Sequence, residues 1–185
     1  MSLDVPCGRT RRLRDFACCG ETWTRLADEA ARGVRAALDN TPREAETVAA
    51  YAELAATILD PVEAQFGPIT LTYGFAGPAL TREIDGRIYP ALDQHAGHER
   101  NAKGKVICER GGAAVDFFCE GVSSADVARW IVAELPFDRL YFYGADRPLH
   151  VSVGPQRAGQ VTLMLPGPSG RRVPRVVRGT ARIPG

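Results

Sequence analysis

Histidine and aspartate side chains are the residues of this 185-residue chain whose types and spacing suit metal chemistry. His95 and His98 lie in a long Gly-rich, charged stretch, Asp116 lies in the apolar run that follows, and His150 begins another apolar run. Two neutral imidazoles and one carboxylate suit catalytic zinc and leave a fourth position open for water. The pattern predicts a Zn²⁺ site formed by Asp116, His150 and either His95 or His98, the alternative being that these are ordinary core or surface residues.

Strands and turns must bring these side chains together. Apolar runs rich in β-branched and aromatic residues predict strands at 69–74, 113–118, 139–143, 149–153 and 160–165. Residues 144–148 have the length and chemistry of a hairpin connection. Apolar residues at helical spacing predict a helix from about Thr41, as its cap, to Leu59, with a bend at Asp60-Pro61, and another helix that begins at 123–126.

Length and composition indicate one globular domain, and the helices and strands predicted above place it in the α+β class. At 45% apolar and 24% charged residues, the chain resembles ordinary globular proteins and is long enough to bury a core. A net charge of +1 provides no overall field that would attract nucleic acid or anionic lipid. Five cysteines, an odd number without zinc-ligand spacing, are expected to be reduced thiols.

Arginines are concentrated at both ends of the chain, which predicts a basic arm at residues 1–14 and a basic tail at 166–185. They are Arg9, Arg11, Arg12, Arg14, Arg171, Arg172, Arg175, Arg178 and Arg182. Solvated chain ends are the favoured interpretation, and a nucleic-acid partner is the less favoured one. No apolar stretch suits a signal peptide or a membrane span, so we expect a cytoplasmic protein without a membrane partner.

Several segments, in the same order, resemble the zinc D-alanyl-D-alanine carboxypeptidases. Gly112 to Asp116 matches the Gly-x-Ala-x-Asp element of that family, and His150 to Val153 resembles its second histidine strand. The likeness covers roughly residues 15–155. The other segments that carry it are 15–20, 40–42, 59–62, 67–74, 77–80 and 137–143.

This resemblance implies a hedgehog/DD-peptidase-like fold, with a central antiparallel sheet, helices packed on it and a helical N-terminal segment, over residues 15–165. It implies a zinc hydrolase of the DD-carboxypeptidase or endopeptidase type that acts on peptides such as those of peptidoglycan. It also favours His95 over His98 as the first ligand, since Gln94-His95 matches the family better. Residues 96–111 then resemble an insertion.

Three departures from the family pattern open an alternative: the long insertion at 96–111, a missing arginine and a shifted general base. Gly74-Phe75-Ala76-Gly77 stands where the family usually has Gly-Tyr-Arg-Ser, so the arginine thought to polarise the substrate carbonyl is missing. Arg82, Arg87 or an arginine of the insertion could replace it. Asp146 is the candidate general base, although it stands four rather than three residues before His150, and a turn residue is the equal alternative. The second hypothesis is a metal-binding domain on this scaffold that performs a non-peptidase reaction or binds a protein, nucleotide or nucleic acid.

Overall fold

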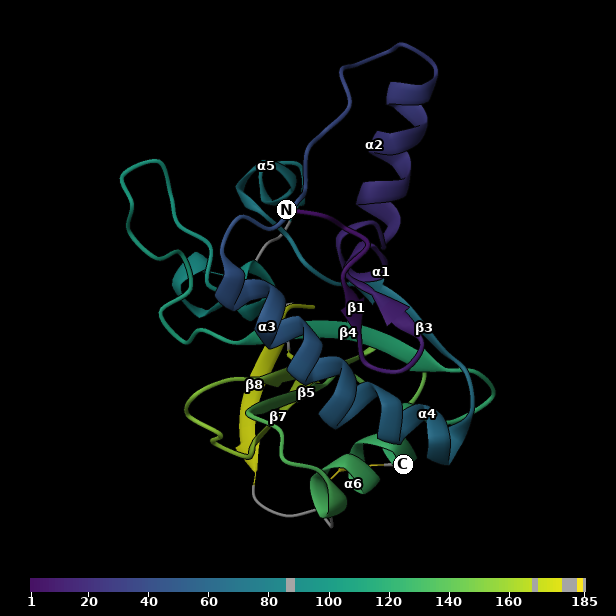
Figure 1. Ribbon diagram of the computed structural model, residues 1–185. Coiled ribbons are helices and arrows are strands. Elements are labelled where there is room, and N and C mark those ends of the chain that lie inside the picture. Colours follow the sequence, from purple (N-terminus) through teal and green to yellow (C-terminus); the bar gives the residue numbers. More distant parts are fainter. Residues whose placement is uncertain (86–88, 168–169, 178–182, 185) are drawn as a thin grey trace.

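The computed structural model describes residues 1–85, 89–167, 170–177 and 183–184. A six-stranded sheet in the order β3-β4-β6-β5-β7-β8 forms the centre of the molecule, and helices lie against it (Figure 1). The predicted α+β class is therefore confirmed. The strands are β3 (Ile69–Tyr73), β4 (Ala113–Cys119), β5 (Arg139–Phe142), β6 (Leu149–Val153), β7 (Gln160–Pro166) and β8 (Arg172–Val177).

The sheet is mixed, so the expectation of a purely antiparallel sheet is wrong at one pair. β5 and β6 form the predicted hairpin, but β7 runs parallel to β5. The cause is the loop 154–159, which returns the chain from the end of β6 to the beginning of β5. The Asp138 carboxylate accepts a hydrogen bond from the Ala158 amide at 2.8 Å, and this bond fixes the loop where β7 starts.

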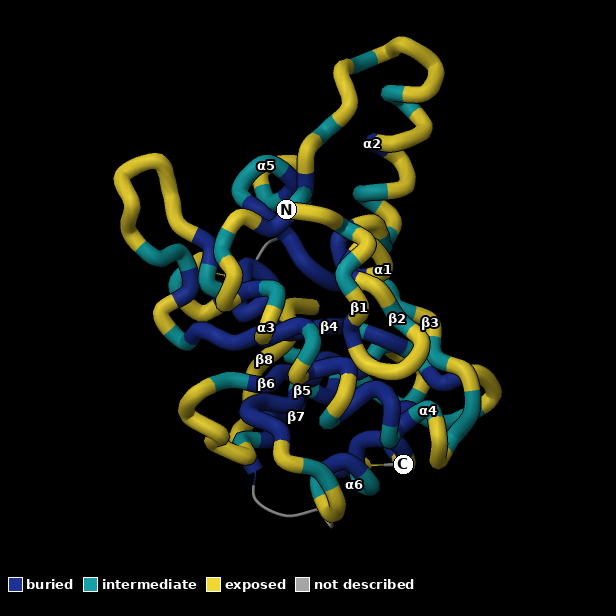
Figure 2. The backbone as a smooth tube through the Cα atoms, in the orientation of Figure 1, coloured by how far each residue is buried: buried dark blue, intermediate teal, exposed yellow. Residues whose placement is uncertain are grey.

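Two helices, α3 (Ala45–Leu54) and α6 (Ser124–Glu134), pack against the central strands of the sheet, and α4 (Asp60–Phe66) packs on α6. α3 contacts β4 and β6, and α6 contacts β4 and β5. The strands contribute alternate apolar side chains to this core, among them Val115, Phe117, Leu149 and Val151. Figure 2 shows the buried backbone concentrated in the central strands and the helix segments next to them. Because side chains alternate along a strand, Asp116 and His150 point to the opposite face.

The long helix differs from its prediction at both ends. It begins at Ala45 rather than Thr41, because the buried Glu99 carboxylate accepts hydrogen bonds from the Arg43 and Glu44 amides just before the helix. A π-helical segment, η1 (Ala55–Leu59), continues directly into α4, so the expected bend at Asp60-Pro61 is replaced by continuous helix. Pro61 cannot donate a backbone hydrogen bond, and the π-helical segment ends at Leu59, two positions before it.

Residues 1–14 are attached to the domain. β1 (Pro6–Cys7) pairs with β2 (Arg11–Arg12), and α1 (Leu13–Ala17) and α2 (Glu21–Ala31) follow. Cys7 and Leu13 are fully buried in the main core. The Arg11 guanidinium forms two hydrogen bonds with the Glu63 carboxylate of α4, at 3.0 and 3.1 Å.

At the other end of the chain, β8 adds an exposed edge strand by pairing with β7. Arg178 and Arg182 lie outside the described residues. All five cysteines are unpaired thiols, as expected. Among the described helices, none has the length and apolar character needed to cross a membrane.

Candidate metal centre

A row of polar and aromatic side chains crosses four strands on the sheet face opposite the helices. Asp116 of β4 pairs with His150 of β6, and His150 pairs in turn with Tyr141 of β5. On the other side, Tyr73 of β3 pairs with Asp116 because the register shifts between Leu71 and Tyr73. Directly paired residues share one face of a sheet, so this register gathers four side chains at one place.

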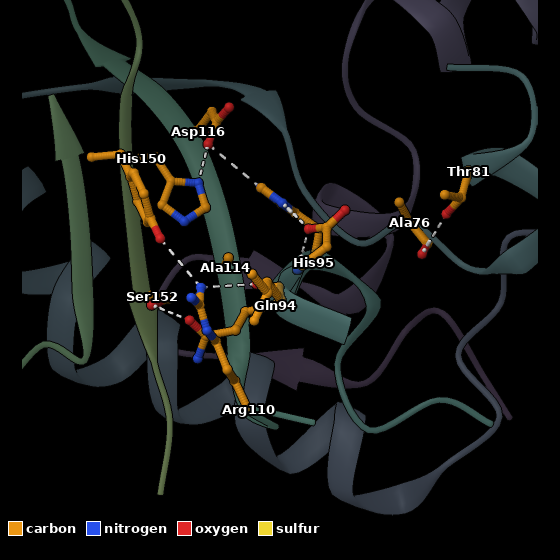
Figure 3. Close-up of polar contacts among 12 residues, drawn as sticks. Ala76, Thr81, Gln94, His95, Arg110, Ala114, Asp116, His150 and Ser152 are labelled. Carbon is orange, nitrogen blue, oxygen red and sulfur yellow. Dashed lines mark hydrogen bonds and ion pairs between the residues drawn. The ribbon is translucent and has the colours of Figure 1, made fainter. Parts of the chain in front are cut away.

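His95 reaches this row from a separate element, the short 3₁₀ helix η3 (Gln94–Ala96). Its ring packs on Tyr73, with centroids 4.0 Å apart, and is 4.9 Å from the ring of His150. Figure 3 shows the Asp116 carboxylate between the two imidazoles. Oδ1 of Asp116 is 2.7 Å from His150 Nδ1 and 3.4 Å from His95 Nε2. One ligand atom from each residue lies within 4.8 Å of the others, so the cluster could hold a metal ion.

The state of the His95 ring fits a metal ligand. Its side chain is 1% exposed, and Nε2 is buried without a hydrogen-bond partner. An unsatisfied buried polar atom is unfavourable by about 1–3 kcal/mol, whereas a cation would use its lone pair. The Asp116 side chain is 25% exposed, so the cluster remains open to solvent on one side. Closed coordination belongs to structural zinc, and an open position belongs to catalytic zinc.

Asp93 orients His95 from behind. Its Oδ1 lies 2.9 Å from His95 Nδ1, which leaves Nε2 to face Asp116 and His150. This carboxylate–histidine arrangement is the usual outer shell of a metal-bound imidazole. Burial by itself lowers the pKa of His95, but the contacts with Asp116 and Asp93 outweigh it and raise that pKa to about 9. Burial raises the pKa of Asp116, but the charges and hydrogen bonds of His150 and His95 have the larger effect. The net result is a pKa well below the ordinary value for aspartate.

Buried hydrogen bonds join η3 to the sheet. Gln94 Nε2 donates to the Gly111 carbonyl and to the Asp138 carboxylate, both at 2.9 Å. Ser152 Oγ donates to Gln94 Oε1 at 2.9 Å. Ser152 is two residues from His150 and Gln94 is next to His95, so this network fixes the distance between the two imidazoles.

His98 belongs to the backbone support and not to the cluster. Its Nε2 accepts a hydrogen bond from the Gly112 amide at 2.9 Å, so that lone pair is already used. Gly112 has φ +84°, and a Cβ there would lie 1.9 Å from the Val153 carbonyl oxygen. Only glycine fits this approach. His98 thus holds the turn through which the chain enters β4, and the structure brings His95, not His98, to Asp116 and His150.

Two cavities lie beside the cluster. One, of about 250 Å³, extends from Asp116 between β3 and the beginning of α2, and its walls include Cys19, Trp23 and Tyr73. Burial raises the pKa of the Cys19 thiol to about 12, which makes it a neutral part of this wall. The other cavity, also about 250 Å³, lies on the His150 side and includes Arg110.

Among the described residues, the other candidates from the sequence have no side-chain contact with His95, Asp116 or His150, although the Ala76 amide donates a hydrogen bond to the His95 carbonyl at 3.1 Å. Asp146 is exposed in the β5–β6 turn, and no described contact joins it to His95, Asp116 or His150. Phe75 and Ala76 have buried apolar side chains, so these two positions provide no side-chain donor in place of the family arginine. Arg87 lies outside the described residues.

Two residues of the site were missed from the sequence. Asp93 stands two positions before His95, near enough in sequence to orient that imidazole, but residue type and spacing alone do not distinguish it from other acidic residues. Arg110 is the second-last residue of the 96–111 segment, and no local pattern distinguishes it from the other arginine there, Arg100. No protein-family model matches this chain, and neither does any curated protein or solved structure.

Proposed function

We propose that the chain is a zinc-dependent hydrolase of the DD-carboxypeptidase or endopeptidase type, acting on peptides such as those of peptidoglycan. One observation carries the proposal: Asp116 lies between two imidazole nitrogens, one of which, His95 Nε2, is buried and unsatisfied. The resemblance of Gly112–Asp116 and His150–Val153 to the zinc DD-peptidases supports the same conclusion.

The donor set favours zinc over the harder cations. Imidazole nitrogens suit zinc and the later first-row metals, whereas magnesium and calcium prefer oxygen ligands alone. His95 Nε2, an Asp116 oxygen and a ring nitrogen of His150 would hold the ion. When bound, Zn²⁺ would polarise a carbonyl oxygen and make water more acidic.

The chain itself contributes orientation and access. Asp93 keeps His95 Nε2 directed at the cluster, and the Gln94 network keeps η3 at a fixed height above β6. The cavities on either side of the cluster offer room for the two parts of a peptide that flank the broken bond. Hydrolysis adds the oxygen of water to the carbonyl carbon, breaks the C–N bond and transfers a proton to the leaving amine.

The direct test is release of D-alanine from a peptide that ends in D-alanyl-D-alanine, with the zinc content measured in the same samples. We expect release that stops with a chelator and returns with zinc, and no release from Asp116→Ala. Without the family arginine the rate should be low, since losing one such donor commonly reduces the rate about 10²–10³-fold. An Asp126→Ala variant, altered at an exposed position on α6, is the matched control.

A specific observation favours a second candidate, a metal-binding domain without peptidase activity. Phe75 and Ala76, which stand where the family has its arginine, are buried and apolar. Asp146 is exposed and has no described contact with the cluster. Full zinc occupancy without cleavage of D-alanyl-D-alanine peptides or muropeptides would overturn the hydrolase proposal in favour of this candidate.

A further inference from the structure

The cavity on the His150 side contains a positively charged side chain, Arg110, that has no role in the hydrolase proposal above. Arg110 lines this cavity together with Tyr141, Tyr143 and His150. Its Nη1 donates to the Leu92 carbonyl at 3.0 Å and to the Tyr141 hydroxyl at 3.2 Å, so the guanidinium is held in place. Among the described residues, no carboxylate lies within ion-pair distance of it. A fixed cation without a counter-ion in a cavity is suited to an anionic ligand.

The position of Arg110 defines which part of a ligand it can reach. The ring of Tyr141 packs edge-on against His150, with centroids 5.0 Å apart, while its hydroxyl contacts Arg110. A whole tyrosine side chain therefore separates the guanidinium from the metal ligand. Because one cavity borders both His150 and Arg110, a peptide with its carbonyl at the cluster would place its next residue beside the guanidinium.

The size and walls of the cavity limit that residue. Its volume of about 250 Å³ is below the ~300–1,000 Å³ typical of pockets for drug-sized ligands. Leu92, Met164 and Pro174 supply apolar walls around the polar end formed by Arg110. This combination accommodates one small residue with a charged end.

We propose that Arg110, held by Tyr141, binds a carboxylate of the substrate and so selects peptides whose residue next to the broken bond is small and C-terminal. The substrate class rests on the proposed hydrolase function. The carboxylate-binding role itself depends only on the contacts of Arg110. It differs from the carbonyl-polarising role of the family arginine, and it is supplied by the 96–111 segment, which has no counterpart in the family pattern.

The first experiment compares a peptide with a free C-terminal carboxylate and the same peptide as its amide. We expect the wild type to prefer the acid by about 10- to 100-fold in kcat/KM, the range for a hydrogen bond to a charged group. Arg110→Gln should lose this preference through a higher KM while keeping its zinc, and Arg110→Lys should keep part of it. Lys103→Gln removes an exposed positive charge from the same segment and should change nothing. Equal cleavage of acid and amide by the wild type would overturn the proposal.

The second experiment separates this proposal from the hydrolase function. Zinc-loaded protein is titrated with N-acetyl-D-alanine and with its amide, and binding is followed by NMR or calorimetry. We expect the wild type and Lys103→Gln to bind the acid more tightly than the amide, and Arg110→Gln to bind both equally weakly. Binding of the acid without cleavage would retain the Arg110 subsite while the hydrolase proposal fails. Acid binding unchanged in Arg110→Gln would sink the subsite whatever the activity.

Discussion

Within the described part of the chain, Asp116 is the one carboxylate that contacts both imidazoles, which makes single substitutions at the cluster informative. We expect about one zinc per chain in the wild type and none after Asp116→Ala, His150→Ala or His95→Ala, because a three-ligand site seldom survives the loss of one ligand. His98→Ala should keep its zinc, since His98 Nε2 is used by the Gly112 amide. Metal analysis of purified variants decides this. Loss of zinc from His98→Ala with retention in His95→Ala would show the assignment of the first ligand to be wrong.

Asp93 should control how tightly the metal is held. In Asp93→Asn the hydrogen bond to His95 Nδ1 becomes neutral, and removal of such an outer partner typically weakens metal binding about 10–100-fold. Competition with a chromophoric chelator measures the dissociation constant, and the stoichiometry at saturating zinc should remain one. Unchanged affinity in this variant would mean that Asp93 has no influence on the ligand.

At the scale of the elements, Glu99 connects the 96–111 segment to the beginning of α3. Its buried carboxylate accepts hydrogen bonds from the Arg43 and Glu44 amides and from the Thr47 hydroxyl. Glu99→Ala leaves these donors unpaired, so we expect the free energy of unfolding to fall by about 1–3 kcal/mol in urea titrations. The control variant Glu109→Ala, at an exposed position of the same segment, should lower the free energy of unfolding by less than about 0.5 kcal/mol. Equal losses in the two variants would contradict the capping role.

The N-terminal hairpin is fastened to α4 by Arg11 and Glu63. A double-mutant cycle of Arg11→Ala and Glu63→Ala should give a coupling of about 0.5–1 kcal/mol at neutral pH. The Arg11 hydrogen bonds lower the pKa of Glu63 from its ordinary 4.5. A lowered pKa in the folded state stabilises the protein above the unfolded value, and this stabilisation disappears as the pH falls through the folded value. The coupling should therefore decline below pH 4.5, and a coupling that persists at pH 2 would contradict this origin.

The same elements show how far the sequence could be interpreted. Local patterns predicted β3, β4, α6 and the β5–β6 hairpin, because alternation and turn chemistry are written in adjacent residues. The start of α3 could not be located, because its cap, Glu99, lies 55 positions away from Glu44. The parallel pairing of β7 likewise depends on Asp138 holding a distant loop.

The candidate site likewise contains residues that the sequence predicts and residues whose positions it does not predict. His95, Asp116 and His150 were predicted as ligands by residue type and by the family likeness, and the structure brings them together. The positions of Arg110 and Asp146 depend on how loops fold back over the sheet. Neither hydrophobic periodicity nor a sequence motif predicts the course of these loops.

At the scale of the whole molecule, the cluster joins η3, β4 and β6, so metal binding should stabilise the entire fold. Zinc at 100 times its dissociation constant should add about 2.7 kcal/mol, which corresponds to a rise of about 5–10 °C in Tm for a chain of this size. Asp116→Ala should show no rise, and calcium should have little effect on the wild type. An equal rise in Asp116→Ala would place the stabilising ion elsewhere.

The row formed by Tyr73, Asp116, His150 and Tyr141 exists in only one alignment of the four strands. If β6 slipped by one residue against β4, every side chain of β6 would change face, and His150 would point into the apolar core. Leu149 or Val151 would then stand beside Asp116. A misaligned chain could still form a sheet but could not assemble the three ligands. A metal ion that needs all three ligands would therefore bind only to chains whose central strands have the observed register.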